Sequence, residues 1–338
     1  MTDAALLAPA PSGALPPATG RPSFSVIMAA YQAESTIADA LRTALTQTQP
    51  PLEVVVCDDG STDGTPRILE GFGDRVRVLR QANSGASVAK NAAAEAASGD
   101  FVAIMDADDL WEPGRLERLG DLAAARPDVD LMTTDAWFLV DAARRGTFYQ
   151  ANGPFPIEDQ ATKILRRNYF FAHVAVRRSV WLKHGGFEPG RLQGEDWDFW
   201  LRLLFAGCLA GCVAEPLADY RIHPASLSAD RTSSLMARVE VLDRAAATQP
   251  LTPAQRDVLA QARREYLHRA RAAHTERALL DAAPDRRRAS FELLRTPGTS
   301  PRARVQAAAA MLAPGWAGRR LRAQQAGRGR ARTDRDIR

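Results

Sequence analysis

Residues 83–113 read NSGASVAKNAAAEAASGDFVAIMDADDLWEP, and the patterns in this stretch identify the class of fold. Ser87–Ser98 is rich in alanine and stops at Gly99, a residue type that often ends helices, so we predict a helix there. Phe101–Met105 is an unbroken apolar run of strand length, which is typical of a strand covered on both faces. Pro113 suits the start of a second helix. A helix, a buried strand and another helix in succession indicate an α/β fold.

Similar alternation continues on both sides of this stretch. Further apolar runs of strand length are Phe24–Ala29, Leu52–Cys57 and Val76–Leu79, and Asp130–Val140 is another predicted strand. Between the first two runs, Ile37, Leu41 and Ala44 share one face of a helix. We therefore predict an α/β domain with a mostly parallel, Rossmann-like sheet flanked by helices, which binds ligands beyond the carboxyl ends of its strands.

Changes in pattern divide the chain into three parts. Residues 1–22 are rich in alanine and proline and lack the basic start and compact apolar core of a signal peptide, so we expect a disordered tail. Residues 23–230 are expected to form the α/β domain, in which the segment 141–170, with its glycines and prolines, is predicted to be mostly a long loop. Residues 231–338 are expected to form a helical extension that ends in a basic tail.

Composition excludes several classes of protein. With 46% hydrophobic and 25% charged residues among 338, the chain as a whole is globular rather than disordered. No stretch of the sequence approaches the roughly 18 consecutive apolar residues of a membrane span. Three cysteines without a CxxC pair argue against a zinc site and fit a reducing compartment, so we expect a cytoplasmic protein.

Charge is distributed unevenly along the chain. Residues 285–338 contain 14 Arg and 4 acidic residues, a balance of +10, and because the whole chain carries +4, residues 1–284 carry −6. A basic tail on an acidic body suits an anionic surface, and we expect this to be the inner face of a membrane, bound peripherally, rather than a nucleic acid. The alternative is an Arg-rich tail that is only solvated.

Acidic residues collect where two of the predicted strands end. Asp106 and Asp108 directly follow the apolar run 101–105, and residues two apart on extended backbone face the same side. The two carboxylates can therefore converge on one hard cation such as Mg²⁺ or Mn²⁺, with phosphate oxygens completing its shell. The alternative is that Asp108 or Asp109 caps the next helix.

A second acidic pair, Asp58 and Asp59, ends the apolar run 54–57. Helix capping accounts for Asp63 or Thr65 a few residues later, but it does not readily account for two adjacent carboxylates at a strand end. A carboxylate that accepts a hydrogen bond from a base N–H or a ribose hydroxyl suits a nucleoside ligand.

Four segments, in this order, resemble the family 2 glycosyltransferases of the GT-A fold. They are SVIMAAYQAESTIADAL (25–41), VVVCDDGSTDGT (54–65), the stretch 83–113 quoted above, and GGFEPGRLQGEDWDFWLRL (185–203). The resemblance covers residues 23–228. It implies a GT-A domain that, with a divalent cation, passes one sugar from a nucleotide diphosphate sugar to an acceptor hydroxyl with inversion at the anomeric carbon.

The resemblance also implies roles for individual residues. The residues expected to contact the nucleotide sugar are Ala30, Tyr31, Glu34, Asp58, Arg80, Gly85, Lys90 and Asp106. Asp108 is expected to bind the cation, Mn²⁺ or Mg²⁺, and His223 matches a position where some relatives place a histidine near the metal. Two alternatives stay open, namely that Lys90 is a surface residue of a helix and that His223 is structural.

The expected catalytic residues lie in the last of the four segments. Asp196 matches the catalytic base of the family, and Glu195 is expected to orient it or to contact the acceptor. As a base, Asp196 needs only to accept the acceptor proton while the new C–O bond forms. The alternative is that residues 195–198 are the acidic first turn of a helix, where carboxylates interact favourably with the helix dipole.

Features that accompany these motifs separate competing functions. A processive polysaccharide synthase is disfavoured, because the sequence shows neither transmembrane segments nor a QxxRW-type motif after the fourth segment. A nucleotidyltransferase is disfavoured, because no Gly-rich, Arg-containing phosphate loop lies near the first strand. A catalytically inactive protein that binds or tethers a nucleotide sugar stays open as the alternative, although the acidic motifs are intact.

Donor and acceptor are expected only as chemical classes. UDP is the commonest donor nucleotide among proteins of this kind, so a UDP-sugar is expected, although the residues do not exclude GDP or TDP. The acceptor is expected to be a glycan, a lipid-linked glycan or a protein, in the synthesis of a cell-surface glycan or glycoconjugate.

Overall fold

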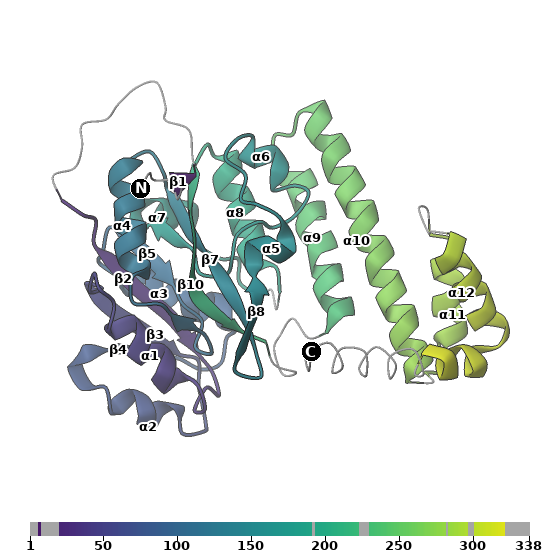
Figure 1. Ribbon diagram of the computed structural model, residues 1–338, viewed down its shortest axis with the longest axis horizontal. Coiled ribbons are helices and arrows are strands. Elements are labelled where there is room, and N and C mark those ends of the chain that lie inside the picture. The colour runs from purple at the N-terminus through teal and green to yellow at the C-terminus, as the bar shows by residue number, and fades with distance from the viewer. Residues whose placement is uncertain are drawn as a thin grey trace, which may run out of the picture. The chain divides into compact units, whose positions relative to one another are not determined.

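The computed structural model describes residues 6–7, 20–190, 193–222, 230–281, 283–296 and 301–321 (Figure 1). The chain divides into two compact units. The first, here termed the sheet unit, combines Met1–Ser226 with Thr248–Pro250, and the second, the helical unit, combines Leu227–Ala247 with Leu251–Arg338.

One sheet runs through the sheet unit. Among the described residues its strands are β1 (Leu6–Leu7), β2 (Phe24–Ala30), β3 (Glu53–Asp58), β4 (Arg77–Arg80), β5 (Phe101–Ile104), β6 (Leu110–Trp111), β7 (Leu131–Val140), β8 (Ala143–Thr147), β9 (Ala175–Arg177) and β10 (Ala210–Arg221). The main order is β1-β10-β7-β9-β5-β2-β3-β4, and β6 and β8 pair with β10 and β7. The pairs β5–β2, β2–β3, β3–β4 and β7–β10 are parallel, whereas β9 is antiparallel to both of its neighbours. The pairs β1–β10, β6–β10 and β7–β8 are also antiparallel. The predicted α/β fold is therefore confirmed, and the sheet is mixed, with β2, β3, β4, β5, β7 and β10 running in one direction.

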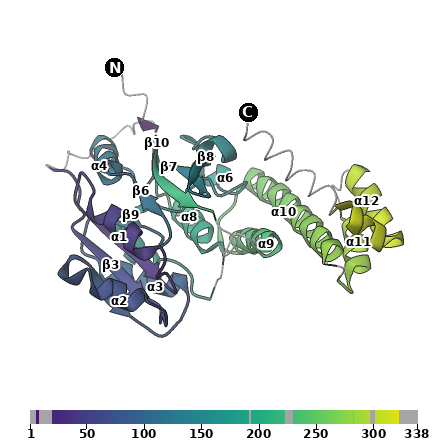
Figure 2. The same cartoon turned by 60° about the horizontal axis from the view of Figure 1, so that its bottom comes forward.

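Helices cover both faces of this sheet (Figures 1 and 2). The described helices of the sheet unit are α1 (Ile37–Leu45), α2 (Thr65–Glu70), α3 (Ala86–Ala96), α4 (Arg115–Ala125), α5 (Phe148–Asn152), α6 (Gln160–Lys163), α7 (Arg178–His184) and α8 (Glu195–Phe205). Side chains alternate along a strand, and Val26, Met28 and Val54 share a core with α1 and α4. On the opposite face, α3 packs on β2 and β3, and α7 packs on β5 and β9. The strands read as continuous apolar runs because both of their faces are buried.

The short strand β1 lies in the segment 1–22, for which the sequence predicts disorder. Leu6 and Leu7 pair with Val213 and Cys212 of β10. An open strand edge offers unpaired backbone groups to any nearby segment, which is a physical reason for this pairing.

The segment 141–170, expected to be mostly a long loop, contains β8, α5 and α6. Its anchor is the buried amide of Gln160, which donates hydrogen bonds to the carbonyl oxygens of Pro156 (3.0 Å) and Ala210 (2.8 Å) and accepts one from the N–H of Ala210 (3.0 Å). The rings of Phe155 and Tyr169 also meet edge to face at 5.2 Å. The sequence missed this order, because contacts with residues far along the chain leave no local periodic pattern.

The helical unit overlaps the segment 231–338, for which the sequence predicts a helical extension. Its described helices are α9 (Arg231–Thr248), α10 (Pro253–Leu280), α11 (Arg286–Leu294), α12 (Pro301–Leu312) and a last stretch over 314–321. A capping box starts α10, since Thr252 Oγ1 accepts a hydrogen bond from the N–H of Gln255 and Gln255 Oε1 accepts one from the N–H of Thr252. None of the described helices is both long enough and apolar enough to cross a bilayer.

Replacement of Gln160 by Ala should destabilise the sheet unit. The backbone groups that Gln160 satisfies would be left without partners in a buried site, which costs about 2–4 kcal/mol in the free energy of unfolding. Five of the six tryptophans lie in the sheet unit, so tryptophan fluorescence during a urea titration reports its unfolding. Gln261→Ala, at an exposed position of α10, is the control. An unchanged midpoint for Gln160→Ala would contradict the anchoring role.

Candidate active site

The acidic residues of the predicted site lie at one edge of the sheet. Asp58 is the last residue of β3, and it pairs in register with Ala30, the last residue of β2. The N–H of Met105, just beyond β5, donates a hydrogen bond to the carbonyl oxygen of Ile27 of β2. Asp106, the next residue, therefore lies at the same edge of the sheet. Neighbouring strands are about 4.8 Å apart and β2 separates β3 from β5, so the backbones at Asp58 and Asp106 are about 10 Å apart.

Asp58 and Arg80 form the first cluster of predicted site residues. The side chain of Asp58 is 1% exposed, its Oδ1 accepts a hydrogen bond from the N–H of Ser61 (3.0 Å), and its Oδ2 lies 3.4 Å from Nε of Arg80. Within the described part of the chain Oδ2 accepts no hydrogen bond, which leaves a buried acceptor for a ligand donor. Asp58 and Arg80 also line a surface pocket with the apolar side chains of Leu69 and Val76.

Side chains after β2 hold the turn that follows β3. Gln32 Oε1 accepts hydrogen bonds from two backbone N–H groups of that turn (2.8 and 3.2 Å), and Glu34 Oε2 accepts one from the N–H of Gly64 (2.6 Å). Glu34, expected to line the nucleotide pocket, thus fixes the backbone beside Asp58. Tyr31 and Ala30, which are also expected to contact the nucleotide sugar, differ in exposure: Tyr31 is 54% exposed and Ala30 is fully buried.

Asp59 shapes the loop after β4 with both of its carboxylate oxygens. Oδ1 accepts hydrogen bonds from the N–H of Ser84 (2.8 Å) and from Nε2 of Gln81 (2.7 Å), and Oδ2 accepts one from the N–H of Gly85 (2.9 Å). Gly85 has φ +93°, a conformation that favours glycine. The sequence marked Asp59 only as the neighbour of Asp58, and its task is to set the loop that carries Gly85.

Lys90, Asp106, Glu195 and Asp196 form the second cluster, from three segments far apart in the chain. Lys90 Nζ lies 2.7 Å from Asp106 Oδ1, and the Lys90 side chain is 13% exposed. Burial alone lowers the pKa of Lys90, but the carboxylates of Asp106, Glu195 and Asp196 outweigh burial and hold that pKa above its ordinary value. Lys90 is therefore a largely covered ammonium among carboxylates rather than a side chain fully exposed on the surface of its helix.

Glu195 and Asp196 begin α8 and are half-buried. Burial, and then the charge of Asp196, raise the pKa of Glu195 to about 7. Burial also raises the pKa of Asp196, while the N–H of Trp197, the charge of Lys90 and the Asn168 amide act to lower it. Asn168 Nδ2 donates a hydrogen bond of 2.8 Å to Asp196 Oδ2. A carboxylate whose pKa is raised accepts a proton more readily than one in water.

Asp198, two residues after Asp196 in the same first turn of α8, has different surroundings. It is buried, and its Oδ2 lies 3.1 Å from Nε of Arg202. Arg202 also donates hydrogen bonds to the carbonyl oxygens of His184 and Gly186. The acidic first turn of α8 thus combines one carboxylate in a structural ion pair with two that interact with Lys90.

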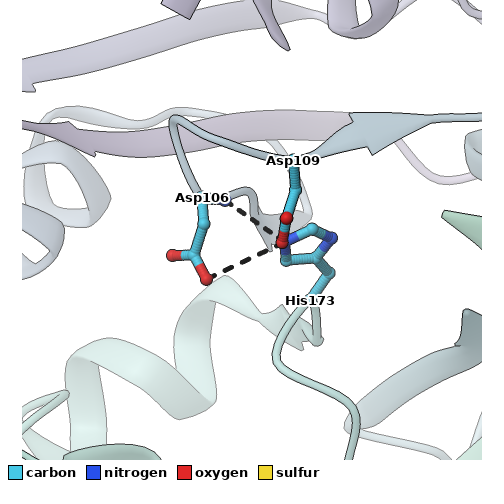
Figure 3. Close-up of side chains that lie close together, drawn as sticks. All are labelled: Asp106, Asp109 and His173. Carbon is cyan, nitrogen blue, oxygen red and sulfur yellow. Dashed lines mark hydrogen bonds and ion pairs between the residues drawn. The ribbon is translucent and has the colours of Figure 1, made fainter. Parts of the chain in front are cut away.

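Asp106, Asp109 and His173 lie close enough to share a cation, as Figure 3 shows, with ligand atoms within 4.8 Å of one another. His173 is fully buried, and its Nδ1 accepts a hydrogen bond from the indole N–H of Trp111 (2.9 Å). Its Nε2 lies 3.0 Å from Asp109 Oδ2, and the backbone N–H of Asp106 also faces this nitrogen, at 3.3 Å. Burial lowers the pKa of His173 to about 3, which keeps the ring neutral. His173 is therefore a neutral ring that lies among Trp111, Asp106 and Asp109.

The carboxylates of this loop are the groups that suit a divalent cation. Burial, and then the charges of Asp106 and Asp108, raise the pKa of Asp109 well above its ordinary range. This repulsion among hard oxygen donors is what bound Mg²⁺ or Mn²⁺ relieves. Asp108, the expected ligand, is half-buried and lies outside the group of three, and His223 lies outside the described residues. Nothing in the sequence around His173 marked it.

Curated proteins similar to this chain are glycosyltransferases. The sequence profile of the family described as "Glycosyl transferase family 2" matches residues 25–185. An uncharacterized glycosyltransferase of Nostoc sp. (strain PCC 7120 / SAG 25.82 / UTEX 2576), alr2836, is 32% identical, over 60% of this chain and 66% of its own length. TuaG of Bacillus subtilis (strain 168), a glycosyltransferase assigned to teichuronic acid biosynthesis, is 30% identical, over 62% and 83%. WfaP of Escherichia coli, named as a UDP-Glc:alpha-D-GlcNAc-diphosphoundecaprenol beta-1,3-glucosyltransferase, is 27% identical, over 64% and 84%. The chain thus spans about two thirds of alr2836 and more than four fifths of the other two.

Solved structures with the same fold include two complexes with nucleotide sugars. S. aureus TarS 1–349 with UDP-GlcNAc has a TM-score of 0.59 and 19% identity, over 90% of this chain and 92% of TarS 1–349. The mannosyltransferase PcManGT from Pyrobaculum calidifontis, with GDP-Man and Mn²⁺, has a TM-score of 0.59 and 24% identity, over 92% and 86%. At these identities the likeness concerns the fold.

The sheet, the acidic edge and these matches define a glycosyltransferase of the GT-A fold. The chain belongs to glycosyl transferase family 2, as its four sequence segments predicted. The family profile ends at residue 185 and does not include Glu195 or Asp196.

Replacement of Glu195 by Gln should stabilise the protein at alkaline pH. The pKa of Glu195 is about 7 in the folded protein and 4.5 in its ordinary range, so between these values the folded state binds more protons and stability falls as pH rises. The neutral amide removes this loss, a gain of the order of 1–3 kcal/mol above pH 7 and none below pH 4. Thermal unfolding from pH 4 to 9 measures it, with the exposed Glu95→Gln as control. A gain that is equal at all pH values would show that the charge of Glu195 is not the cause.

Proposed function

We propose that this protein moves a single sugar from a nucleotide diphosphate sugar to an acceptor hydroxyl, with inversion at the anomeric carbon. The observation that carries the proposal is the position of Asp196. Its side chain is half-buried, one carboxylate oxygen accepts a hydrogen bond from Asn168, and the carboxylate interacts with Lys90 and Asp106 at the carboxyl edge of the sheet. A base with a raised pKa beside the donor site is what an acceptor hydroxyl requires.

In the proposed reaction, Asp196 accepts the proton of the acceptor hydroxyl. The hydroxyl oxygen forms a bond to the anomeric carbon while the bond from that carbon to the diphosphate oxygen breaks, and the leaving nucleoside diphosphate keeps the electron pair. Attack from the face opposite the nucleotide inverts the anomeric carbon. The site contributes by holding the two reacting atoms together, and Glu195 orients Asp196 or contacts the acceptor.

Asp58 and Arg80 are the proposed anchors of the donor nucleotide. The buried Oδ2 of Asp58 can accept a hydrogen bond from a base N–H, and Arg80 lines the same pocket. The remaining proposed donor contacts are Ala30, Tyr31, Glu34, Gly85, Lys90 and Asp106. The names of WfaP and the TarS complex support a UDP-sugar, and the PcManGT complex makes a GDP-sugar the alternative to test.

A divalent cation, Mn²⁺ or Mg²⁺, is the proposed cofactor. The crowded carboxylates after β5 support it, with Asp108 as the proposed ligand and Asp106 beside it. When bound, the cation neutralises negative charge on the departing diphosphate. His223 is a second proposed ligand on the strength of the family resemblance alone.

The proposed acceptor belongs to the synthesis of a cell-surface glycan. TuaG is assigned to teichuronic acid biosynthesis, and the name of WfaP gives a diphosphoundecaprenol-linked acceptor. A lipid-linked glycan is therefore the acceptor class that the relatives favour, ahead of a free glycan or a protein.

We also propose that the helical unit binds an anionic membrane peripherally, at its cytoplasmic face. Val305 and Leu312, seven residues apart on one face of α12, are 70% and 77% exposed, and Trp316 is 47% exposed. The guanidinium of Arg320 lies 5.2 Å from the centroid of the Trp316 ring. Apolar side chains that enter the lipid interface beside Arg residues that bind anionic headgroups are typical of such surfaces.

Asp196→Asn should lower the rate of transfer by about 10²–10⁴-fold, because an amide cannot accept the proton. Donor binding should change little, since the substitution keeps the shape of the side chain. Release of nucleoside diphosphate with and without acceptor measures turnover, and thermal shifts with UDP- and GDP-sugars in the presence of Mn²⁺ measure donor binding. Asp243→Asn, on the exposed surface of α9, is the control. Normal turnover by Asp196→Asn would show that Asp196 is not the catalytic base. If the unaltered protein binds the donor but never transfers the sugar, the inactive nucleotide-sugar-binding protein is the better interpretation.

Leu312→Asp should weaken flotation of the full chain with vesicles that contain phosphatidylglycerol. In the bound state the Leu312 side chain would be buried in the lipid interface. Loss of this contact and gain of a negative charge should reduce the fraction of protein bound to vesicles about tenfold or more. Leu182→Asp, at an exposed leucine of α7, is the matched control and should float like the unaltered protein. Equal flotation of both variants, or none by the unaltered protein, would reject the membrane surface.

A further inference from the structure

Asn168 contacts the proposed base from a segment that carries none of the family motifs. It lies between α6 and β9, and its Nδ2 donates a hydrogen bond of 2.8 Å to Asp196 Oδ2. Its own Oδ1 accepts a hydrogen bond of 3.1 Å from the N–H of Phe170. A backbone N–H can only donate, so the oxygen of the amide must face Phe170 and the NH₂ group must face Asp196.

The segment around Asn168 is fixed on both sides. The indole N–H of Trp197 donates to the carbonyl oxygen of Ile164 (2.9 Å), which joins this segment to the first turn of α8. On the other side of Asn168, the ring of Phe170 packs against the ring of Trp200 of α8, with centroids 5.6 Å apart. Asn168 is thus held in place before any acceptor arrives, and its contact with Asp196 needs no rearrangement.

We propose that Asn168 is the positioning residue of the catalytic base, which holds Oδ2 of Asp196 so that Oδ1 is presented to the acceptor hydroxyl. The proposal rests on the proposed function. It adds a neutral donor to a set of charged groups that face Asp196, namely Glu195 on the same helix, Lys90 on α3 and Asp106 after β5. A hydrogen bond to an ionised carboxylate both orients it and favours the ionised form.

Asn168→Asp separates this role from simple packing. The substitution is isosteric and keeps an oxygen for the N–H of Phe170, but it replaces the donor toward Asp196 with another carboxylate. We expect kcat to fall about 10- to 100-fold in Asn168→Ala and further in Asn168→Asp, with little change in the KM for the donor. In a plot of kcat against pH, the acidic limb reports protonation of the base. This limb should move to higher pH in both variants, and further in Asn168→Asp.

A merely structural role predicts the opposite order, since Ala leaves a hole and Asp does not. Asn152→Ala, an exposed asparagine of α5, is the matched control and should behave like the unaltered protein. Thermal unfolding of each variant shows whether it is folded. Asn168→Asp with activity equal to or above that of Asn168→Ala, and an unmoved acidic limb, would overturn the proposal.

The double variant with Asp196→Asn links the role to the base. If Asn168 acts through Asp196, Asn168→Ala should cause no further loss from the residual turnover of Asp196→Asn. Additive losses would mean that Asn168 acts elsewhere. The two proposals also fail differently: full turnover by Asp196→Asn would reject the proposed function, whereas an inactive Asp196→Asn together with unaltered Asn168 variants would reject only the positioning role.

Discussion

The ion pair between Lys90 and Asp106 is the interaction on which the charged site depends. The two groups meet at 2.7 Å, where α3 and the end of β5 come together, and both are largely withdrawn from water. Either charge alone in such a place would cost several kcal/mol. Without the Lys90 ammonium, the carboxylate of Asp106 would also be repelled by Glu195 and Asp196 nearby. The ammonium makes it feasible to pack three carboxylates around it, and the carboxylates in turn keep the ammonium protonated. The Lys90 ammonium and the surrounding carboxylates therefore stabilise one another in their charged forms.

The elements that carry these charges are joined by a glycine turn. Asn91, the neighbour of Lys90 on α3, accepts a hydrogen bond from the N–H of Phe187 (2.9 Å) and donates one to its carbonyl oxygen (2.7 Å). Gly186 has φ +65°, and a Cβ there would collide with Asn91 Oδ1 and with Trp181. Because Arg202 of α8 also donates to the carbonyl oxygen of Gly186, the turn connects the helix of Lys90 with the helix of Asp196. A side chain at position 186 would therefore disturb both.

The sequence predicted what local pattern encodes and missed what depends on distant partners. β2, β3 and β5 were evident because burial on both faces leaves an unbroken apolar run, whereas β9 has three residues and no readable period. Asp58, Asp106 and Asp196 stood out because each follows a strand or opens a helix within a motif. Asn168, His173 and Asp59 did not stand out, since their roles depend on contacts with residues far along the chain. Their partners Asp196, Asp109 and Ser84 are 28, 64 and about 25 residues away, respectively. The prediction of Asp108 as metal ligand remains a prediction, and the structure adds Asp109 and His173 beside it.

The bonds that hold the segment 148–170 have a consequence for how such proteins diverge. Tyr149 is tied to Asp135 of β7, Gln160 to Ala210 of β10, and Asn168 to Asp196 of α8. The loops after β2, β3 and β4 are instead braced against one another through Gln32, Glu34 and Asp59. The segment 148–170 and the loops after β2, β3 and β4 thus rest on separate supports, so one can be remodelled for a new partner while the other keeps its shape.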